Sequence, residues 1–229
     1  MPWLWNLVDI MNSALFQIRY GKRLRNIEKV KLLAFENHFV KKGKYRVVPI
    51  RDIKADVMTN FFSRQPTEAY RFFKPHGFDV KSIKKLQKNR AFIGYVLEDV
   101  VNGRIAGYCF NRSFFHGKGF RGRMVDMDYR GRGLGTMMNY LLNEVGFGIG
   151  LRLFETVSKD NVASYKSAIS ASPFRVVEEL PQNELFLEII NDTKQGNEMN
   201  KNIMGGGKTQ VIRLQPHFNA YTEQERMAA

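Results

Sequence analysis

The chain has 229 residues and a mass of 26.6 kDa, enough for one domain with a buried core. Hydrophobic residues make up 44% of it, which excludes a disordered polar chain, and the single cysteine, Cys109, excludes an internal disulfide and a cysteine metal cluster. The net charge of +14 suggests a polyanionic partner: nucleic acid, an anionic membrane or a phosphorylated ligand.

Membrane-spanning and secretory segments are not expected. No stretch reaches about 18 consecutive apolar residues, and the N-terminus lacks a basic region followed by an apolar block. We therefore expect a cytoplasmic protein, and we expect no bound metal. Cys109 lies in a segment typical of a strand, so we interpret it as a packed core residue, with a catalytic thiol as the alternative.

Residues 1–44 are predicted to form an N-terminal helical extension. An apolar stripe recurs in it at spacings of three and four residues: Leu4, Val8, Met11, Leu15 and Ile18. We expect this stripe to pack on the domain or on a second subunit, as in a homodimer. The alternative is peripheral membrane contact through residues 1–25, because Trp3 and Trp5 stand at the start of the stripe and basic residues follow it.

Residues 45–190 are predicted to form an α/β domain with a mixed central sheet. In chain order we expect a strand at 45–50, a helix at 51–62, a loop at 63–79, a helix at 80–89, strands at 91–100, 104–110 and 122–129, a helix at 136–145, a strand at 151–157, a helix at 161–170, and strands at 174–180 and 185–190. Asn102-Gly103 indicates a hairpin. Residues 191–229 are expected to be a mobile tail.

A loop with three alternating glycines separates the strand at 122–129 from the next helix. The first amides of a helix lack internal partners and carry the positive end of its dipole, so a glycine loop before a helix can bind phosphate. Arg130 and Arg132 add positive charge. The dinucleotide-binding pattern Gly-x-Gly-x-x-Gly does not fit, because the third glycine comes one residue too early.

The segment Arg130-Gly131-Arg132-Gly133-Leu134-Gly135 resembles the Gln/Arg-x-x-Gly-x-Gly/Ala signature of the GNAT superfamily of N-acetyltransferases. It follows the fourth strand, as it does in that family. Two later segments, 160–164 and 174–179, resemble the family more loosely. The resemblance implies an α/β (α+β) GNAT acyl-CoA N-acyltransferase fold. Its mixed central sheet would have a V-shaped splay between the fourth and fifth core strands and helices around it.

The same resemblance implies acetyl-CoA as the cofactor. The loop amides would hold the pyrophosphate of coenzyme A, and the strand before the loop would pair with its pantetheine arm. The cofactor-binding residues are then Val125, Met127, Arg130, Gly131, Arg132, Gly133, Leu134, Gly135, Thr136 and Asn161.

Transfer of an acetyl group to an amine calls for a base and a general acid. Asp126 and Glu155, on neighbouring strands, are the candidate bases, and either could instead be a solvated or paired carboxylate at a strand end. Tyr165 is the candidate acid, although the family usually has this tyrosine seven residues after the asparagine, where this chain has Ala168. The alternative is that Tyr165 packs in the core or contacts coenzyme A.

The acceptor is expected at the loop 63–79, where Phe73, His76 and Phe78 are the candidate binding residues. This loop loosely resembles GNAT proteins of surface-polysaccharide pathways, so the expected acceptor is a primary amine of an amino sugar or sugar nucleotide. Two alternatives stay open: a GNAT-fold protein that binds coenzyme A without transfer, and a basic nucleic-acid-associated protein. No nucleic-acid-binding motif is present, so no specific nucleic-acid partner is expected.

Overall fold

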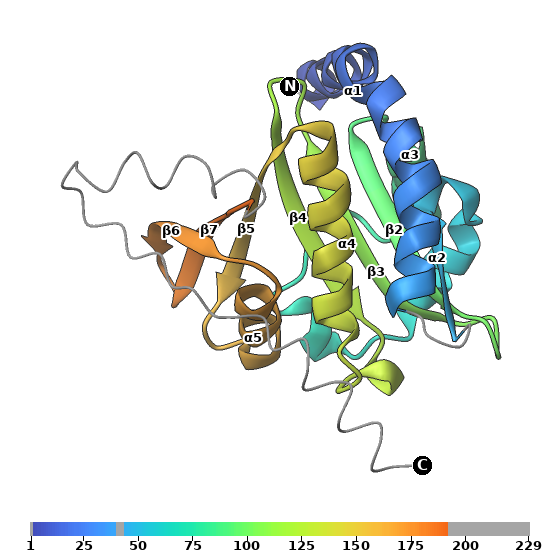
Figure 1. Cartoon of the computed structure of the whole chain (residues 1–229), viewed down its shortest axis with the longest axis vertical. Coiled ribbons are helices and arrows are strands. Elements are labelled where there is room, and N and C mark those ends of the chain that lie inside the picture. The colour runs from blue at the N-terminus through green and yellow to red at the C-terminus, as the bar shows by residue number, and fades with distance from the viewer. Residues whose placement is uncertain (1, 40–43, 192–229) are drawn as a thin grey trace.

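The computed structural model describes residues 2–39 and 44–191. Figure 1 shows the helices and strands of this part of the chain. In order they are α1 (Pro2–Phe39), β1 (Tyr45–Pro49), η1 (Ile50–Asp52), α2 (Ala55–Ser63), η2 (Thr67–Tyr70), α3 (Val80–Lys88), β2 (Phe92–Asp99), β3 (Ile105–Ser113), β4 (Lys118–Val125), η3 (Met127–Tyr129), α4 (Leu134–Ile149), β5 (Arg152–Ser158), α5 (Val162–Ala171), β6 (Phe174–Leu180) and β7 (Glu184–Ile189).

The strands form one mixed sheet in the order β1-β2-β3-β4-β5-β7-β6. Neighbouring strands are antiparallel except β4 and β5, which are parallel. Only three residue pairs join these two strands, from Lys118–Arg152 to Phe120–Phe154, although β4 has 8 residues and β5 has 7. The strands therefore separate after Phe120, and the predicted α/β fold with a splay between the fourth and fifth strands is confirmed.

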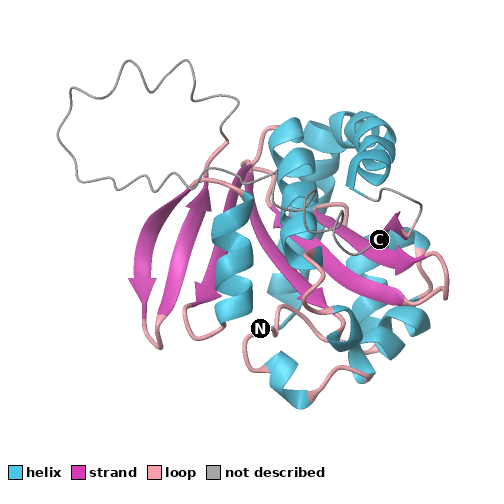
Figure 2. Cartoon of the chain, turned by 60° about the horizontal axis from the view of Figure 1, so that its bottom comes forward, coloured by secondary structure: helices cyan, strands magenta, loops and turns pink. Residues whose placement is uncertain are grey.

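Helices cover both faces of the sheet (Figures 1 and 2). On one face, Leu141 and Leu142 of α4 pack with the buried side of α1. On the other, Phe61 and Phe62 of α2 pack with Ile83 of α3. Because β2 and β3 are buried on both faces, their sequences read as nearly continuous apolar runs. Cys109 on β3 is buried within this core, as predicted, and burial raises the pKa of its thiol.

The main error of the predicted elements concerns β4. The strand begins at Lys118 rather than at 122 and ends at Val125 rather than at 129, and Met127–Tyr129 is a 3₁₀ turn. Asp126 ends the strand because its side chain accepts a hydrogen bond from the amide of Asp128 at 3.0 Å, which caps the turn. The helix after the glycine loop also begins earlier, at Leu134.

The predicted N-terminal helix is confirmed, but the expectation that its apolar stripe packs on the domain is wrong. Every member of the stripe is exposed, from Leu15 at 40% to Ile18 at 82%. Phe16, Tyr20 and Leu24 pack on the domain instead. Almost all of the predicted tail, 192–229, lies outside the described residues.

Candidate functional site

The backbone of β4 presents hydrogen-bonding groups to the splay. The carbonyl of Gly117, just before β4, accepts a hydrogen bond from the backbone amide of Arg152, the first residue of β5, at 2.8 Å. Successive residues of a strand turn their backbone groups to opposite sides, so every second residue after Gly117 faces β5, as far as Arg123 and Val125. At that point β5 has separated from β4. The Val125 peptide is therefore placed to pair with an extended polar ligand, as predicted for pantetheine.

The glycine loop holds its amides open. Gly131 and Gly133 have φ values of 77° and 74°, which glycine adopts without strain, and Gly133 caps α4. Within the described residues, the amides from Gly131 to Thr136 donate no hydrogen bond, and the first amide that does so is Met137, to the Gly133 carbonyl at 3.1 Å. These free donors lie at the positive end of a helix of 16 residues. This is the geometry of a phosphate site.

The two arginines of the loop are exposed but held differently. The Arg132 guanidinium lies 4.8 Å from the centre of the Tyr129 ring and donates to the Asp128 carbonyl at 2.9 Å. Arg130 makes no ion pair with the part of the chain that the structure describes. Arg130 is therefore the side chain best placed to add charge to a bound phosphate.

The other residues of the loop position α4. Leu134 is 2% exposed and packs in the core, so it anchors the start of the helix. Gly135 lies so close to α5 that an added Cβ would be 3.0 Å from the Ser167 hydroxyl. The Thr136 hydroxyl is 3.4 Å from that of Ser170. These contacts fix the first turn of α4 and aim its amides.

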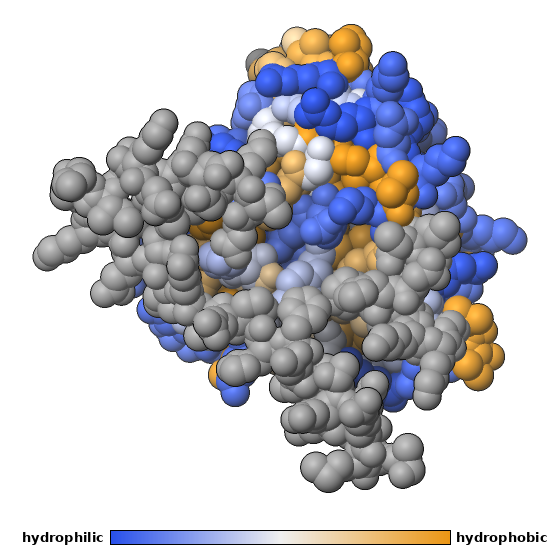
Figure 3. Space-filling model, in the orientation of Figure 1, coloured by the Kyte–Doolittle hydropathy of each residue, from blue (hydrophilic) through white to orange (hydrophobic). Residues whose placement is uncertain are grey.

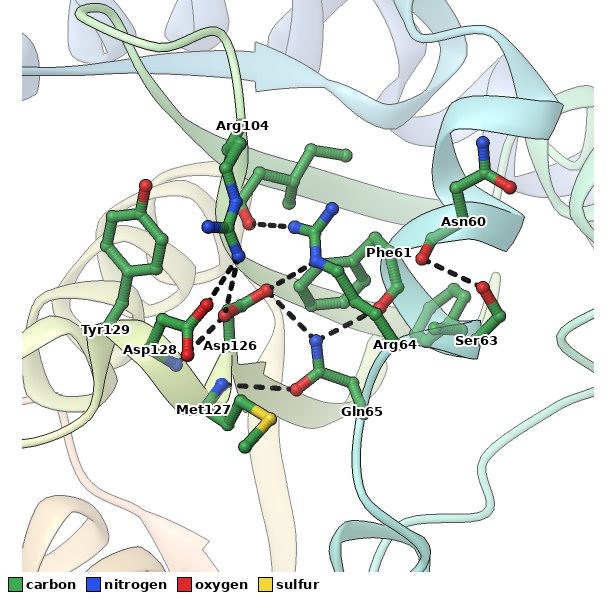
Figure 4. A network of polar contacts seen from close by, with 12 residues as sticks. Asn60, Phe61, Ser63, Arg64, Gln65, Arg104, Asp126, Met127, Asp128 and Tyr129 are labelled. Carbon is green, nitrogen blue, oxygen red and sulfur yellow. Dashed lines mark hydrogen bonds and ion pairs between the residues drawn. The ribbon is translucent and has the colours of Figure 1, made fainter.

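Asp126 is embedded in a network of donors beside the loop (Figure 4). Its carboxylate accepts hydrogen bonds from Arg64 Nε at 2.8 Å and Gln65 Nε2 at 3.1 Å, and its side chain is fully buried. Burial opposes ionisation, but the bond from Arg64 and the amide of Asp128 outweigh it and hold the pKa of Asp126 below its ordinary value. A buried, paired carboxylate is a poor proton acceptor, which argues against Asp126 as the base.

The same network corrects the assignment of Met127 to the pantetheine-binding strand. Met127 lies beyond the strand, and its amide donates to Gln65 Oε1 at 3.2 Å (Figure 4). The sequence reasoning missed Arg64 and Gln65 because they stand at the end of α2, about sixty residues before the groups they hold. No local pattern indicates such a contact.

Glu155, the second candidate base, is 4% exposed and bridges two arginines of β4. Its carboxylate accepts from Arg121 Nε at 2.7 Å and from Arg123 Nη1. Burial would raise the pKa of Glu155, but Arg123 and Arg121 together lower it. Arg123 also donates to the Ser164 carbonyl at 2.8 Å and to the Ser167 hydroxyl at 3.1 Å. The ion pairs connect β4 to β5 across the splay, and the hydrogen bonds of Arg123 connect β4 to α5. A carboxylate held in this way is a poor proton acceptor, which argues against Glu155 as the base.

The two predicted residues of α5 lie near this crossing. Asn161 caps the helix, because its Oδ1 accepts from the Ser164 amide at 3.2 Å. Tyr165, on the next turn, is half-buried and packs against the core. Ala168 is 1% exposed, so no proton donor stands at the position where the family usually has its tyrosine.

The three predicted acceptor residues gather on the opposite face of the sheet. His76 Nε2 lies 2.9 Å from the Tyr108 hydroxyl, and the ring centres of His76 and Phe78 are 5.1 Å apart. Phe73 stacks on Phe78 with the rings 14° from parallel. Burial lowers the pKa of His76, which keeps the imidazole neutral near pH 7. The three side chains form a packed cluster, whereas Arg71, Phe72 and Lys74 of the same loop are exposed, as are Glu68 and Asp79.

Comparison with known proteins identifies the fold. No protein-family model and no curated protein matches the sequence. The GNAT domain of S. lividans PAT is 15% identical over 63% of this chain and 89% of its own, with a TM-score of 0.54. A domain from Methanocaldococcus jannaschii is 16% identical over 64% of this chain and 97% of its own, with a TM-score of 0.52. The chain therefore has the fold of a GNAT domain, as predicted from its glycine loop.

Proposed function

We propose that this protein is an acetyl-CoA-dependent N-acetyltransferase that acts on a primary amine of a small molecule. The observation that carries the proposal is the row of free amides from Gly131 to Thr136, at the end of a strand whose edge is open. These amides would bind the pyrophosphate of coenzyme A. The pantetheine arm would then run along the backbone of Val125 toward the splay.

The reaction is direct transfer within the splay. The amine nitrogen attacks the thioester carbonyl, a C–N bond forms, and the C–S bond breaks to release the coenzyme A thiolate. A backbone amide near Val125 would stabilise the oxyanion. The nitrogen loses one proton and the thiolate gains one, so the products are an amide and a free thiol. Tyr165 is the proposed donor of the proton that the thiolate gains.

The amine must arrive without its extra proton, because an ammonium has no lone pair. Since Asp126 and Glu155 are both held in buried ion pairs, we propose that solvent takes this proton. The protein would supply position and electrostatic stabilisation rather than a side-chain base.

For the acceptor we propose an amino sugar or a sugar nucleotide. The exposed ring of Phe72, with Arg71 lying 4.9 Å from its centre, offers a flat apolar surface beside a cation. Such a pair suits a sugar ring that carries phosphate. Gln65, in the same loop, accepts a hydrogen bond from the Met127 amide at 3.2 Å, which connects this loop to the turn before the glycine loop.

Release of free thiol from acetyl-CoA tests the activity. We expect release that depends on the amine and is fastest with amino sugars or their nucleotide derivatives. If only amines of another class support thiol release, the transferase activity is supported and the proposed acceptor is overturned. The absence of release with every amine of a broad panel would overturn the transferase.

Two glycine substitutions test the cofactor site. Gly131→Val forces a β-branched residue into a left-handed conformation where an added Cβ meets nothing within 4 Å. Gly103→Val does the same in the β2–β3 hairpin, where φ is 66°. Each should destabilise the fold by about 1–3 kcal/mol. Only Gly131→Val should weaken acetyl-CoA binding, by at least about tenfold, as measured by calorimetry. Equal affinities of the two variants would contradict the site.

A second candidate function is coenzyme A binding without transfer. It is favoured by Ala168 at the usual position of the acid and by the ion pairs of both candidate bases. Saturable binding of acetyl-CoA with no thiol release would select this function, whereas release with any amine would remove it.

A further inference from the structure

The first turns of α1, before Phe16, dock on the domain through polar residues. The side-chain oxygen Oδ1 of Asn6 accepts a hydrogen bond from Lys85 Nζ at 2.7 Å. The Asn12 side chain donates to the Ser113 carbonyl at 3.0 Å and accepts from the Phe115 amide at 2.9 Å. The docking side chains are Asn6, Asp9, Asn12 and Ser13. Their spacing places them on one face of the helix.

The opposite face is apolar and exposed to solvent. At 3.6 residues per turn, five apolar side chains fall within a sector of about 80° that points away from the docking face. They are Leu4 (46% exposed), Leu7 (46%), Met11 (53%), Leu15 (40%) and Ile18 (82%). Trp3 and Trp5 at the tip are 63% and 73% exposed. We call these seven residues the apolar tip.

Figure 3 shows hydrophobic surface at the end of the molecule where α1 begins. A soluble domain normally places the apolar side of a helix inward. Here the side that faces inward is polar from Asn6 to Ser13 and becomes apolar only at Phe16 and Tyr20, so the apolar tip is left for a partner.

Basic side chains lie on the same side of α1 as the apolar tip, in the turns that follow it. Lys22, Arg25 and Lys29 follow it at helical spacing, and all three are exposed. None of them makes an ion pair with another described residue. Arg19 and Arg23 line an open hollow of about 570 Å³ next to them. The surface therefore combines an apolar end with a positively charged flank.

We propose that α1 docks on an anionic lipid bilayer, with the apolar tip in the interface and these cations on the headgroups. Amphipathic helices with tryptophans and flanking cations bind membranes in this way. A second copy of the chain would bring like charges together on a protein of net charge +14. Nucleic acid would pair with the cations and leave the apolar tip in water. No described helix is long and apolar enough to cross a membrane, so α1 lies on the surface.

The docking surface is separate from the proposed cofactor site. Arg23 of α1 donates to the Ile149 carbonyl at the last turn of α4, whereas the glycine loop begins the first turn. A helix of 16 residues is about 24 Å long. The glycine loop therefore stays open to solvent while α1 rests on lipid, and the lipid test is independent of the transferase test.

Tryptophan fluorescence provides the test, because Trp3 and Trp5 are the only tryptophans of the chain. We expect vesicles of equal parts phosphatidylcholine and phosphatidylserine to shift the emission to shorter wavelength and to pellet the protein, and phosphatidylcholine alone to do neither. The change Leu7→Asp with Met11→Asp should abolish pelleting. It should leave the unfolding midpoint unchanged, because both side chains are exposed.

Two controls make the test specific. Val101→Asp makes a like change at a side chain 86% exposed in the β2–β3 hairpin, and it should pellet as the wild type does. Lys22→Glu with Arg25→Glu should reduce pelleting at least about tenfold. Pelleting that survives Leu7→Asp with Met11→Asp would overturn the proposal, and so would no pelleting at all. A dimer that this variant dissociates would assign the surface to a second copy and also overturn it.

Discussion

Asp126 stands where β4 ends, and its carboxylate connects the end of α2 to the turn that follows β4. Arg64 and Gln65 come from the end of α2, and the amide of Asp128 comes from the turn before the glycine loop (Figure 4). The carboxylate therefore sets the direction in which the chain leaves the strand and enters the loop.

Asp126→Asn should lower the free energy of unfolding by about 2 kcal/mol at pH 7, as measured by urea denaturation. The estimate is below that for a fully buried pair because Arg64 is 34% exposed and can be hydrated. A loss of turnover with unchanged stability would instead identify Asp126 as the base.

The same substitution makes a prediction about pH. Because the pKa of Asp126 is lowered in the fold, the unfolded chain takes up its proton first as the pH falls. The stability difference between wild type and Asp126→Asn should hold from neutral pH to about pH 5 and then shrink as the pH falls through the ordinary value of about 3.9. A difference that is constant down to about pH 3 would contradict this account.

At the scale of elements, the crossing between β4 and β5 keeps the splay in shape. The strands pair over three residues only, and beyond them the contact runs through Glu155, Arg121 and Arg123. These side chains replace the missing ladder with ion pairs. The edge of β4 then stays free for a ligand while β5 remains in place.

Glu155→Gln should therefore be costly, because it leaves two buried guanidinium groups without a negative partner. We expect a loss of about 3–5 kcal/mol in the free energy of unfolding. Glu188→Gln is the matched control, since Glu188 also bridges two arginines, Arg152 and Arg175, whose side chains are 59% and 47% exposed. It should cost about 1 kcal/mol or less. Equal losses in the free energy of unfolding for the two variants would show that Glu155, Arg121 and Arg123 do not behave as a buried ion cluster.

Local patterns predicted most elements. The Asn-Gly hairpin, the glycine loop and the helix repeats are signals carried within a few residues. The strand β4 was misplaced because glycines at 119 and 122 weaken the strand signal, and the apolar residues at 127 and 129 imitate alternation beyond its end. What ends the strand is Asp126, whose partners Arg64 and Gln65 lie about sixty residues earlier.

Side-chain partners at long range also limited the prediction of the site. The glycine loop before α4 was predicted because glycines and helix-start amides act locally, and phosphate binding by it stays a prediction. The state of Glu155 was not, because Arg121 and Arg123 are more than thirty residues away in sequence. For α1, periodicity predicted the apolar stripe but not its direction, which Asn6 and Asn12 decide through contacts about eighty to a hundred residues away.

At the scale of the whole molecule, the net charge of +14 has two proposed uses. Arg130 at the glycine loop would attract the phosphates of coenzyme A, and the cations of α1 would attract anionic lipid. The two surfaces lie at opposite ends of α4, so a membrane-bound protein could still exchange its cofactor and a soluble acceptor with the solvent.

The proposal that solvent takes the proton of the amine predicts a particular pH profile. The logarithm of kcat/KM should rise by about one per pH unit until the pKa of the acceptor amine is reached, because only the free amine reacts. Two acceptors of different amine pKa should therefore level off at different pH values. If both profiles level off at the same pH, a group of the protein acts as the base.

The central claim is that the amides of the glycine loop bind the pyrophosphate of coenzyme A, and NMR measures those amides directly. Selective ¹⁵N-labelling of glycine leaves 19 glycines to assign. We predict that acetyl-CoA shifts the amide signals of Gly131, Gly133 and Gly135 saturably, that pyrophosphate alone shifts the same signals more weakly, and that Gly103 stays unchanged. Saturable binding of acetyl-CoA that leaves the three loop signals in place, or no binding at all, would contradict the account.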